Sequence, residues 1–221
     1  MKTIKTLIVS FNNHISPKDV PLFRGAVIQS LEEKNILFHN HTENGFRYSY
    51  PLIQYKRIRG KAAIVGVDKG TKVLDEIISL GQIILKLRNK ETEFSIEEIL
   101  TEEINLSICE KMHSYQLHNW IPLNSENYEK YNSSDSLAFR LALLEKVLIG
   151  NIISFVKGMD IHLDNQINAS ITHLNHTKVI KYKGIGLTCF DIDFKTNLAL
   201  PDFIGLGKSS SIGFGILKRV D

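Results

Sequence analysis

The sequence predicts an α+β fold made of two packed β-rich units. Apolar, β-branched runs alternate with helical periodicity along the chain, and the first elements follow an order close to β-α-β-β-α-β, the ferredoxin-like split βαβ. The 221 residues suit one large domain or two of about 100 residues. We expect a first unit over residues 1–115 and a second over residues 120–221.

The first unit opens with a strand, because residues 3–11 (TIKTLIVSF) are apolar and β-branched. A helix follows the Ser-Pro-Lys-Asp start signal and runs to about residue 34, with apolar residues repeating on one face. Further on, FRYSYPLIQYK, RIRG and KAAIVGV predict a strand, a turn and a partner strand. The remaining predicted elements are a helix over 73–82, a strand over 83–89, a short helix over 95–103 and a strand over 104–116.

The second unit is expected to be an incomplete or modified copy of the first, although no sequence repeat marks it as one. Residues 120–135 (WIPLNSENYEKYNSSD) are polar and turn-rich, which is typical of a connection. A long, mostly apolar helix is predicted next, over residues 135–159. Four strand candidates follow, over residues 167–175, 178–184, 185–197 and 211–220.

Charge is unevenly distributed, although the formal net charge is only +3. Residues 47–72 hold seven Lys and Arg against one acid, whereas residues 91–110 hold seven Glu and no basic residue. This asymmetry is compatible with one face built to bind an anion, and equally with two ordinary solvated faces.

Cys109 and Cys189 lie far apart and fit no metal-binding spacing, so we expect two reduced thiols rather than a disulfide. The N-terminus lacks a signal-peptide pattern, and no apolar stretch approaches the roughly 20 residues needed to span a bilayer. These features predict a cytoplasmic protein.

A histidine pair is the first candidate site, in the segment FHNHTENGFRYSYP (38–51). If the segment is extended, His39 and His41 point to the same side with their Cα atoms about 6.5 Å apart, close enough to flank one phosphate. Imidazoles exchange protons near neutral pH, so a catalytic pair is possible. A polar loop and a metal site are the alternatives, and a metal would need further ligands, for which Asp160, His162 and Asp164 are candidates.

Two further segments carry groups that suit phosphate. The predicted hairpin supplies five cations, and the tail GLGKSSSIGFG (205–215) combines four glycines, three serines and one lysine. Ordinary alternatives are a solvated hairpin and a glycine-rich turn. The candidate phosphate-binding residues are Arg47, Lys56, Arg57, Arg59, Lys61, Gly205, Gly207, Lys208, Ser209, Ser210, Ser211, Gly213 and Gly215.

Three stretches together resemble the CRISPR-associated protein six family of the RAMP superfamily. They are the tail, the segment from FHNH to FRYSYPLIQYKRIRGKAAIVGV, and WIPLNSENYEKY. The resemblance implies two tandem ferredoxin-like, RRM-related domains, the second irregular. It also implies a metal-independent endoribonuclease without a cofactor, which cuts CRISPR precursor transcripts once per repeat. In the subtype with a His-x-His pair, the residues that match the catalytic positions are His39, His41 and Tyr48.

The resemblance implies that the ribose 2′-OH attacks the adjacent phosphate, leaving a 2′,3′-cyclic phosphate and a 5′-OH. Its expected partner is CRISPR repeat RNA, with a homodimer or other subunits of a CRISPR effector complex as further possibilities. The alternative function is a non-cleaving RNA-binding RAMP subunit of such a complex, which would need the basic face and the tail but no imidazoles.

Overall fold

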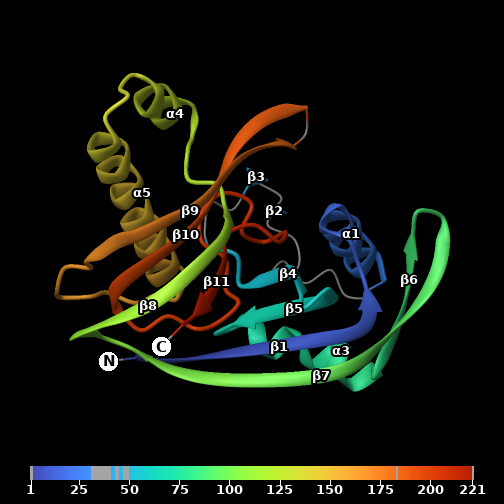
Figure 1. The fold of residues 1–221 in the computed structure, drawn as a ribbon. Coiled ribbons are helices and arrows are strands. Elements are labelled where there is room, and N and C mark those ends of the chain that lie inside the picture. The colour runs from blue at the N-terminus through green and yellow to red at the C-terminus, as the bar shows by residue number, and fades with distance from the viewer. Residues whose placement is uncertain (1, 31–40, 43–44, 47–49, 183, 221) are drawn as a thin grey trace. The chain divides into compact units, whose positions relative to one another are not determined.

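The computed structural model describes residues 2–30, 41–42, 45–46, 50–182 and 184–220 (Figure 1). Contacts divide the chain into two compact units. The N-terminal unit comprises Thr3–Ile104 with Ser211–Gly213, and the C-terminal unit comprises Met1–Lys2, Asn105–Ser210 and Phe214–Asp221. Each unit contains its own β-sheet, and the predicted α+β class is confirmed.

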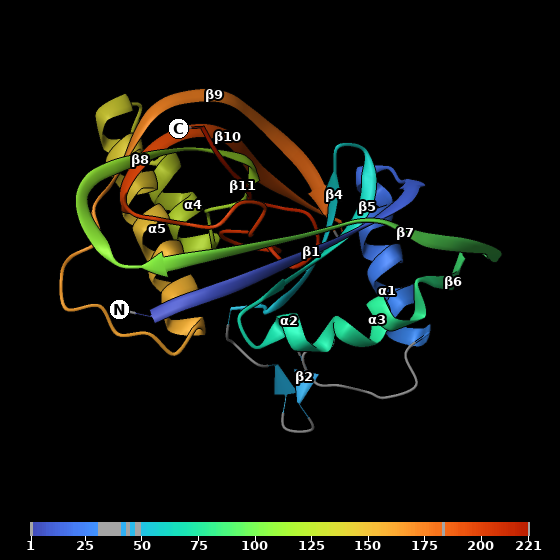
Figure 2. The ribbon, with the colours of Figure 1, turned by 90° about the horizontal axis from the view of Figure 1, so that it is seen from below.

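The sheet of the N-terminal unit has the order β4-β5-β1-β7-β6. Its first four strands reproduce the ferredoxin-like order, and β6 extends the edge by pairing with β7. Figure 2 shows the three helices of this unit on one side of the sheet. The elements are β1 (Lys2–His14), η1 (Pro17–Asp19), α1 (Val20–Ser30), β4 (Ile53–Ile58), β5 (Lys61–Val67), α2 (Gly70–Val73), α3 (Asp75–Leu80), β6 (Gln82–Leu87) and β7 (Lys90–Leu106).

Aromatic rings hold α1 against this sheet. Phe23 of α1 is fully buried, and its ring centroid lies 5.8 Å from that of Phe11, 5.4 Å from that of Phe94 and 6.0 Å from that of Tyr55. These rings come from β1, β7 and β4, so one helical side chain ties three strands together. Burial of apolar side chains such as these is the dominant favourable contribution to the folding free energy of the unit.

The short helix predicted over residues 95–103 is wrong, because this segment lies inside β7. Ser95 pairs with Gln82 of β6, and near the end of the strand Ile104 and Leu106 are buried on alternate positions. Pairing with neighbouring strands outweighs the helix propensity of the Glu and Leu residues, which is a weak preference.

The sheet of the C-terminal unit has the order β11-β8-β10-β9. The chain order β8, α5, β9, β10, β11 gives the ferredoxin-like pattern with its second helix missing, since residues 199–215 are all described and contain no helix. This is the irregularity predicted for the second domain. The elements are β8 (Ile108–Trp120), α4 (Ser125–Asn132), α5 (Leu137–Gly158), β9 (Ala169–Tyr182), β10 (Ile185–Leu198) and β11 (Ile216–Arg219).

Three expectations for this region need correction. The strand predicted over 104–116 as the last of the first unit is mostly β8, which pairs with β10 and β11 in the second sheet. The predicted connection over 120–135 contains the helix α4, which begins where Asn124 accepts a hydrogen bond from the Asn127 N–H. The strands predicted over 167–175 and 178–184 form one bulged strand, β9. It is continuous because it pairs with β10 from Ala169 to Tyr182.

The long predicted helix is confirmed as α5. Leu144, Leu148, Ile152 and Phe155 are fully buried at the three- and four-residue spacing of one helical face. Among the helices that the structure describes, none has the length and apolar composition needed to cross a membrane.

Candidate functional site

Of the predicted catalytic residues, only His41 falls on described backbone. It lies in β2 (His41–Thr42), which pairs with β3 (Gly45–Phe46), His41 opposite Phe46. The backbone at His41 is therefore extended. An extended backbone is what the expected same-side arrangement of His39 and His41 requires at residue 41. His39, Tyr48 and Arg47 lie outside the described residues. The catalytic roles of His39, His41 and Tyr48 and the RNA-binding role of Arg47 therefore stay predictions.

The predicted basic hairpin is β4 and β5. Its two turn residues, Arg59 and Gly60, have φ angles of 49° and 88°, which is the left-handed backbone of a two-residue hairpin turn. Arg57 and Arg59 are exposed, and the Nε of Arg57 donates to the Ile15 carbonyl at 2.8 Å. Lys61 is partly buried and its ammonium lies 2.6 Å from the Glu97 carboxylate.

Lys56 differs from the other cations of the hairpin because its side chain is fully buried. Burial lowers the pKa of its ammonium to about 7, since the low-dielectric surroundings disfavour the charged form. Residue type did not reveal this burial, and the part of Lys56 in RNA binding stays a prediction.

Sequence reasoning did not single out His14, which lies beside the hairpin turn. It ends β1 opposite Lys61, and a Cβ placed on Gly60 would lie 3.0 Å from its Nδ1 and 3.6 Å from Arg57 Nη2. The antiparallel pairing of β1 with β5 brings His14 next to the hairpin turn. No local sequence signal points to it, because the two strands are separated by some fifty residues of chain.

Two positions of the glycine-rich tail require glycine. Gly215 has a φ of 58°, and a Cβ there would lie 1.8 Å from the Leu206 carbonyl oxygen. Gly207 has a φ of 85°, and a Cβ there would lie 2.8 Å from the Trp120 indole ring. At these two positions the close backbone approach that glycine allows is to the protein itself, and the part of the glycines in RNA binding stays a prediction.

Several N–H groups of the tail donate to carbonyls of the same unit. Leu206 donates to Gly215, Gly215 to Asn119, and Lys208 to Ile121, at 2.8, 2.9 and 3.1 Å. These N–H groups already have acceptors. The Lys208 side chain is exposed, whereas the Ser209 and Ser211 side chains are partly buried and Ser210 is buried. Contacts from this tail to a phosphate would therefore come mainly from the side chains of Lys208, Ser209 and Ser211.

The structure places part of the tail beside the basic hairpin. The Tyr55 N–H of β4 donates to the Ser211 carbonyl at 2.8 Å, and Tyr55 forms a parallel bridge with Ile212. A Cβ on Gly213 would lie 3.4 Å from Val20 Cγ1. Residues 211–213 of the tail thus lie along the edge of β4 within the N-terminal unit.

Within the described part of the chain, no group of three or more His, Cys, Asp and Glu side chains is arranged to hold a metal ion. Asp160, His162 and Asp164 line a cavity of about 380 Å³ with Lys2, whose ammonium donates to the Met159 carbonyl.

Both cysteines are free, as predicted. Burial raises the pKa of the Cys189 thiol to about 11. Cys109 lies 3.4 Å from His113 Nε2, and Arg219 Nη2 lies 2.9 Å from His113 Nδ1. Because arginine only donates, His113 accepts at Nδ1 and carries its proton on Nε2.

The fold and the tail define a tandem ferredoxin-like protein whose second unit replaces a helix by a glycine-rich loop. The Cas6b N-terminal domain model matches residues 2–105, and the Cas6b C-terminal domain model matches residues 107–220. The chain therefore belongs to the Cas6b family.

Individual proteins and solved structures are similar to this chain. A crystal structure of Cas6b superposes with a TM-score of 0.88 at 27% identity, covering 99% of this chain and 100% of that one. A second, titled as the CRISPR RNA processing endoribonuclease Cas6b, gives a TM-score of 0.76 at 24% identity over 99% and 100% of the two chains. An uncharacterized protein of Methanocaldococcus jannaschii is 30% identical over 148 residues, which are 64% of this chain and 99% of that protein.

Proposed function

We propose that this protein is an endoribonuclease that cuts CRISPR precursor transcripts within each repeat and so releases guide RNAs. The observation that carries the proposal is the match of both Cas6b domain models, in order, over residues 2–220. The similar structure titled as a CRISPR RNA processing endoribonuclease supports the same activity. The expected location is the cytoplasm.

The proposed chemistry is internal transesterification without a metal ion. A base removes the proton of the ribose 2′-OH, whose oxygen attacks the adjacent phosphorus. The bond from phosphorus to the 5′-oxygen breaks, and an acid protonates that oxygen. The products are a 2′,3′-cyclic phosphate and a 5′-OH. His39 and His41 supply the base and the acid, and Tyr48 orients the reacting groups.

The RNA backbone is held by two sets of side chains in this proposal. Arg57 and Arg59 are exposed on the hairpin, and Lys208 is exposed in the tail. Residues 211–213 of the tail lie along β4 within the N-terminal unit, which supports a role for the hairpin side of this set. The remaining members of the proposed set are Arg47, Lys61, Ser209 and Ser211.

The direct test uses repeat RNA from the CRISPR array of the same genome, incubated with the protein in EDTA. The same RNA carrying a single 2′-deoxy nucleotide at each candidate position serves as the control. We expect one cut, which one deoxy substitution abolishes. His39→Ala and His41→Ala should each slow single-turnover cleavage by about 10²- to 10⁴-fold.

Unchanged cleavage by both histidine variants would refute their assignment, and loss of cleavage in EDTA would refute the metal-independent mechanism. Tight binding without cleavage would favour the non-cleaving RAMP subunit instead. Light scattering of the protein with and without RNA tests the expected homodimer.

A further inference from the structure

A groove between α4 and α5 lies in the C-terminal unit and has a volume of about 620 Å³. This volume falls in the range of about 300–1,000 Å³ that is typical of small-molecule sites. Leu143 and Val147 contribute an apolar wall, and the aromatic ring of Phe139 lines the groove while 45% exposed. Amide side chains of Asn127 and Asn151 line it as well.

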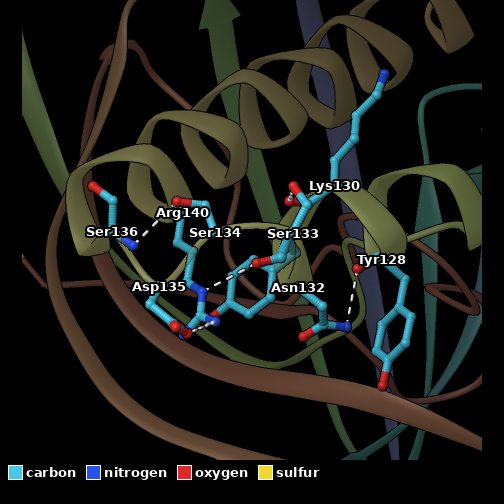
Figure 3. A network of polar contacts seen from close by, with 9 residues as sticks. Tyr128, Lys130, Asn132, Ser133, Ser134, Asp135, Ser136 and Arg140 are labelled. Atoms are coloured by element: carbon cyan, nitrogen blue, oxygen red, sulfur yellow. Dashed lines mark hydrogen bonds and ion pairs between the residues drawn. The ribbon is translucent and has the colours of Figure 1, made fainter.

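The ends of the two helices are braced at their junction, as Figure 3 shows. Arg140 of α5 donates from Nε to the Tyr131 carbonyl at 3.1 Å, and its guanidinium lies 5.0 Å from the centre of the Tyr131 ring. Its Nη2 also contacts Asp135 at 3.2 Å. The Ser136 side chain caps α5 by accepting from the Phe139 N–H. These contacts hold α4 and α5 in one arrangement, so the groove is a formed site.

One end of the groove adjoins the glycine-rich tail within the same unit. The Asn151 side-chain oxygen accepts from Trp120 Nε1 at 2.9 Å, and it lies 3.1 Å from the position of a Cβ on Gly207. Next to Trp120, the Ile121 carbonyl accepts from the Lys208 N–H. Because the Asn151 oxygen is engaged, its NH₂ group is the part that can donate to a ligand.

The charged groups of the groove favour an anionic ligand. Lys146 lines the groove and is exposed, and no described carboxylate lies within ion-pair distance of it. The neighbouring Glu145 is engaged elsewhere, since its carboxylate accepts from the Ile171 N–H at 2.8 Å. Lys130 also lines the groove, but it is paired with Glu126. The groove thus offers an apolar wall, amide groups and a cation. These suit the face of a base, the polar edge of the base and a phosphate.

We propose that the α4–α5 groove binds one unstacked nucleotide of the repeat RNA. The base packs on Phe139, Leu143 and Val147, its polar edge faces Asn127 and Asn151, and its phosphate faces Lys146. This inference rests on the proposed function, because the adjoining tail makes RNA the expected ligand. Single-stranded RNA is commonly recognised by such stacking of a splayed base on an aromatic ring.

The test measures the affinity of the protein for repeat RNA that carries a 2′-deoxy nucleotide at the cut position, so that binding is observed without turnover. The RNA is scanned with single abasic substitutions. Phe139→Ala should weaken binding by about 5- to 150-fold. At one RNA position the abasic substitution should weaken binding to the wild-type protein but not to Phe139→Ala, because both changes remove the same contact.

Lys146→Ala should weaken binding at all salt concentrations and lower the slope of log Kd against log salt by about 0.7, the value for one phosphate of a single strand. The controls are Leu137→Ala and Lys157→Ala, which truncate an apolar and a basic side chain of α5 outside the groove lining. Both controls should bind like the wild-type protein.

If the wild-type protein cuts repeat RNA while both groove variants bind it normally, the groove proposal is wrong and the proposed function stands. If the wild-type protein neither binds nor cuts, the proposed function itself fails. A change of oligomeric state in Phe139→Ala without a change in RNA affinity would overturn the proposal in favour of a second copy of this chain as the occupant.

Discussion

Replacing Lys56 by Met should stabilise the protein, by an amount that depends on pH. Lys56 is fully buried, and burial lowers the pKa of its ammonium from 10.5 to about 7. Between pH 10.5 and 7 the unfolded chain takes up a proton that the folded chain does not. The unfolding free energy therefore decreases as pH falls from 10.5 to about 7. Below pH 7 the whole of this loss remains.

The size of this cost follows from the two pKa values. At about 1.4 kcal/mol per pKa unit, the difference between 10.5 and about 7 corresponds to about 5 kcal/mol as an upper limit. Met has a similar shape without the charge, so Lys56→Met removes the cost. A polar contact that Met does not replace subtracts about 1 kcal/mol. At pH 7, which equals the folded pKa, about 4 kcal/mol of the cost applies, so the net gain should be about 3 kcal/mol.

Urea unfolding at pH 7, 8, 9 and 10 measures this effect as the difference in unfolding free energy between Lys56→Met and the wild-type protein. The difference should shrink by about 1 kcal/mol for each pH unit above 7. Lys86→Met is the matched control, because Lys86 is exposed on β6 and its amine is in water in both states. A stability difference for Lys56→Met that is constant with pH would refute the reasoning.

Two further predictions concern the tail and the thiols. Gly215→Ala should destabilise the protein by about 2–4 kcal/mol, measured as a fall in Tm, because its Cβ would overlap the Leu206 carbonyl oxygen at a positive φ. Gly25→Ala, in α1 with open space around the new Cβ, should instead stabilise it by about 1 kcal/mol. In an aromatic-disulfide thiol assay, only the partly exposed Cys109 should react in the native protein and both cysteines in denaturant. Burial raises the pKa of Cys189 to about 11, so reaction of both thiols in the native state at pH 8 would contradict the structure.

Elements with a clear local pattern were predictable from the sequence. The hairpin β4–β5 follows from two apolar runs around an Arg-Gly turn, and α5 follows from its long apolar periodicity. The segment 95–103 was not predictable in this way, because Glu and Leu favour a helix in isolation. Its pairing within β7 is decided by strands β6 and β1, which local sequence does not encode.

The assignment of strands to sheets was also beyond local pattern. β8 follows β7 after a single residue, so adjacency along the chain suggested one sheet for both. The structure pairs β8 with β10 and β11, whose residues lie some seventy to a hundred positions further on. Such pairings join strands that are distant along the chain, and local sequence pattern carries no information on them.

For the candidate site too, the sequence gives the chemical type of each residue, whereas only the three-dimensional structure gives its position and burial. Arg57, Arg59 and Lys208 could be named as candidates for phosphate binding from residue type alone. The burial of Lys56 could not be predicted, because its strand position says only which face it occupies. The hydrogen bond from Tyr55 to Ser211 joins residues that are 156 positions apart, and it brings the tail beside the hairpin. Local pattern does not encode this contact, and it allows the hairpin and residues 211–213, which belong to one unit, to be tested together as one surface.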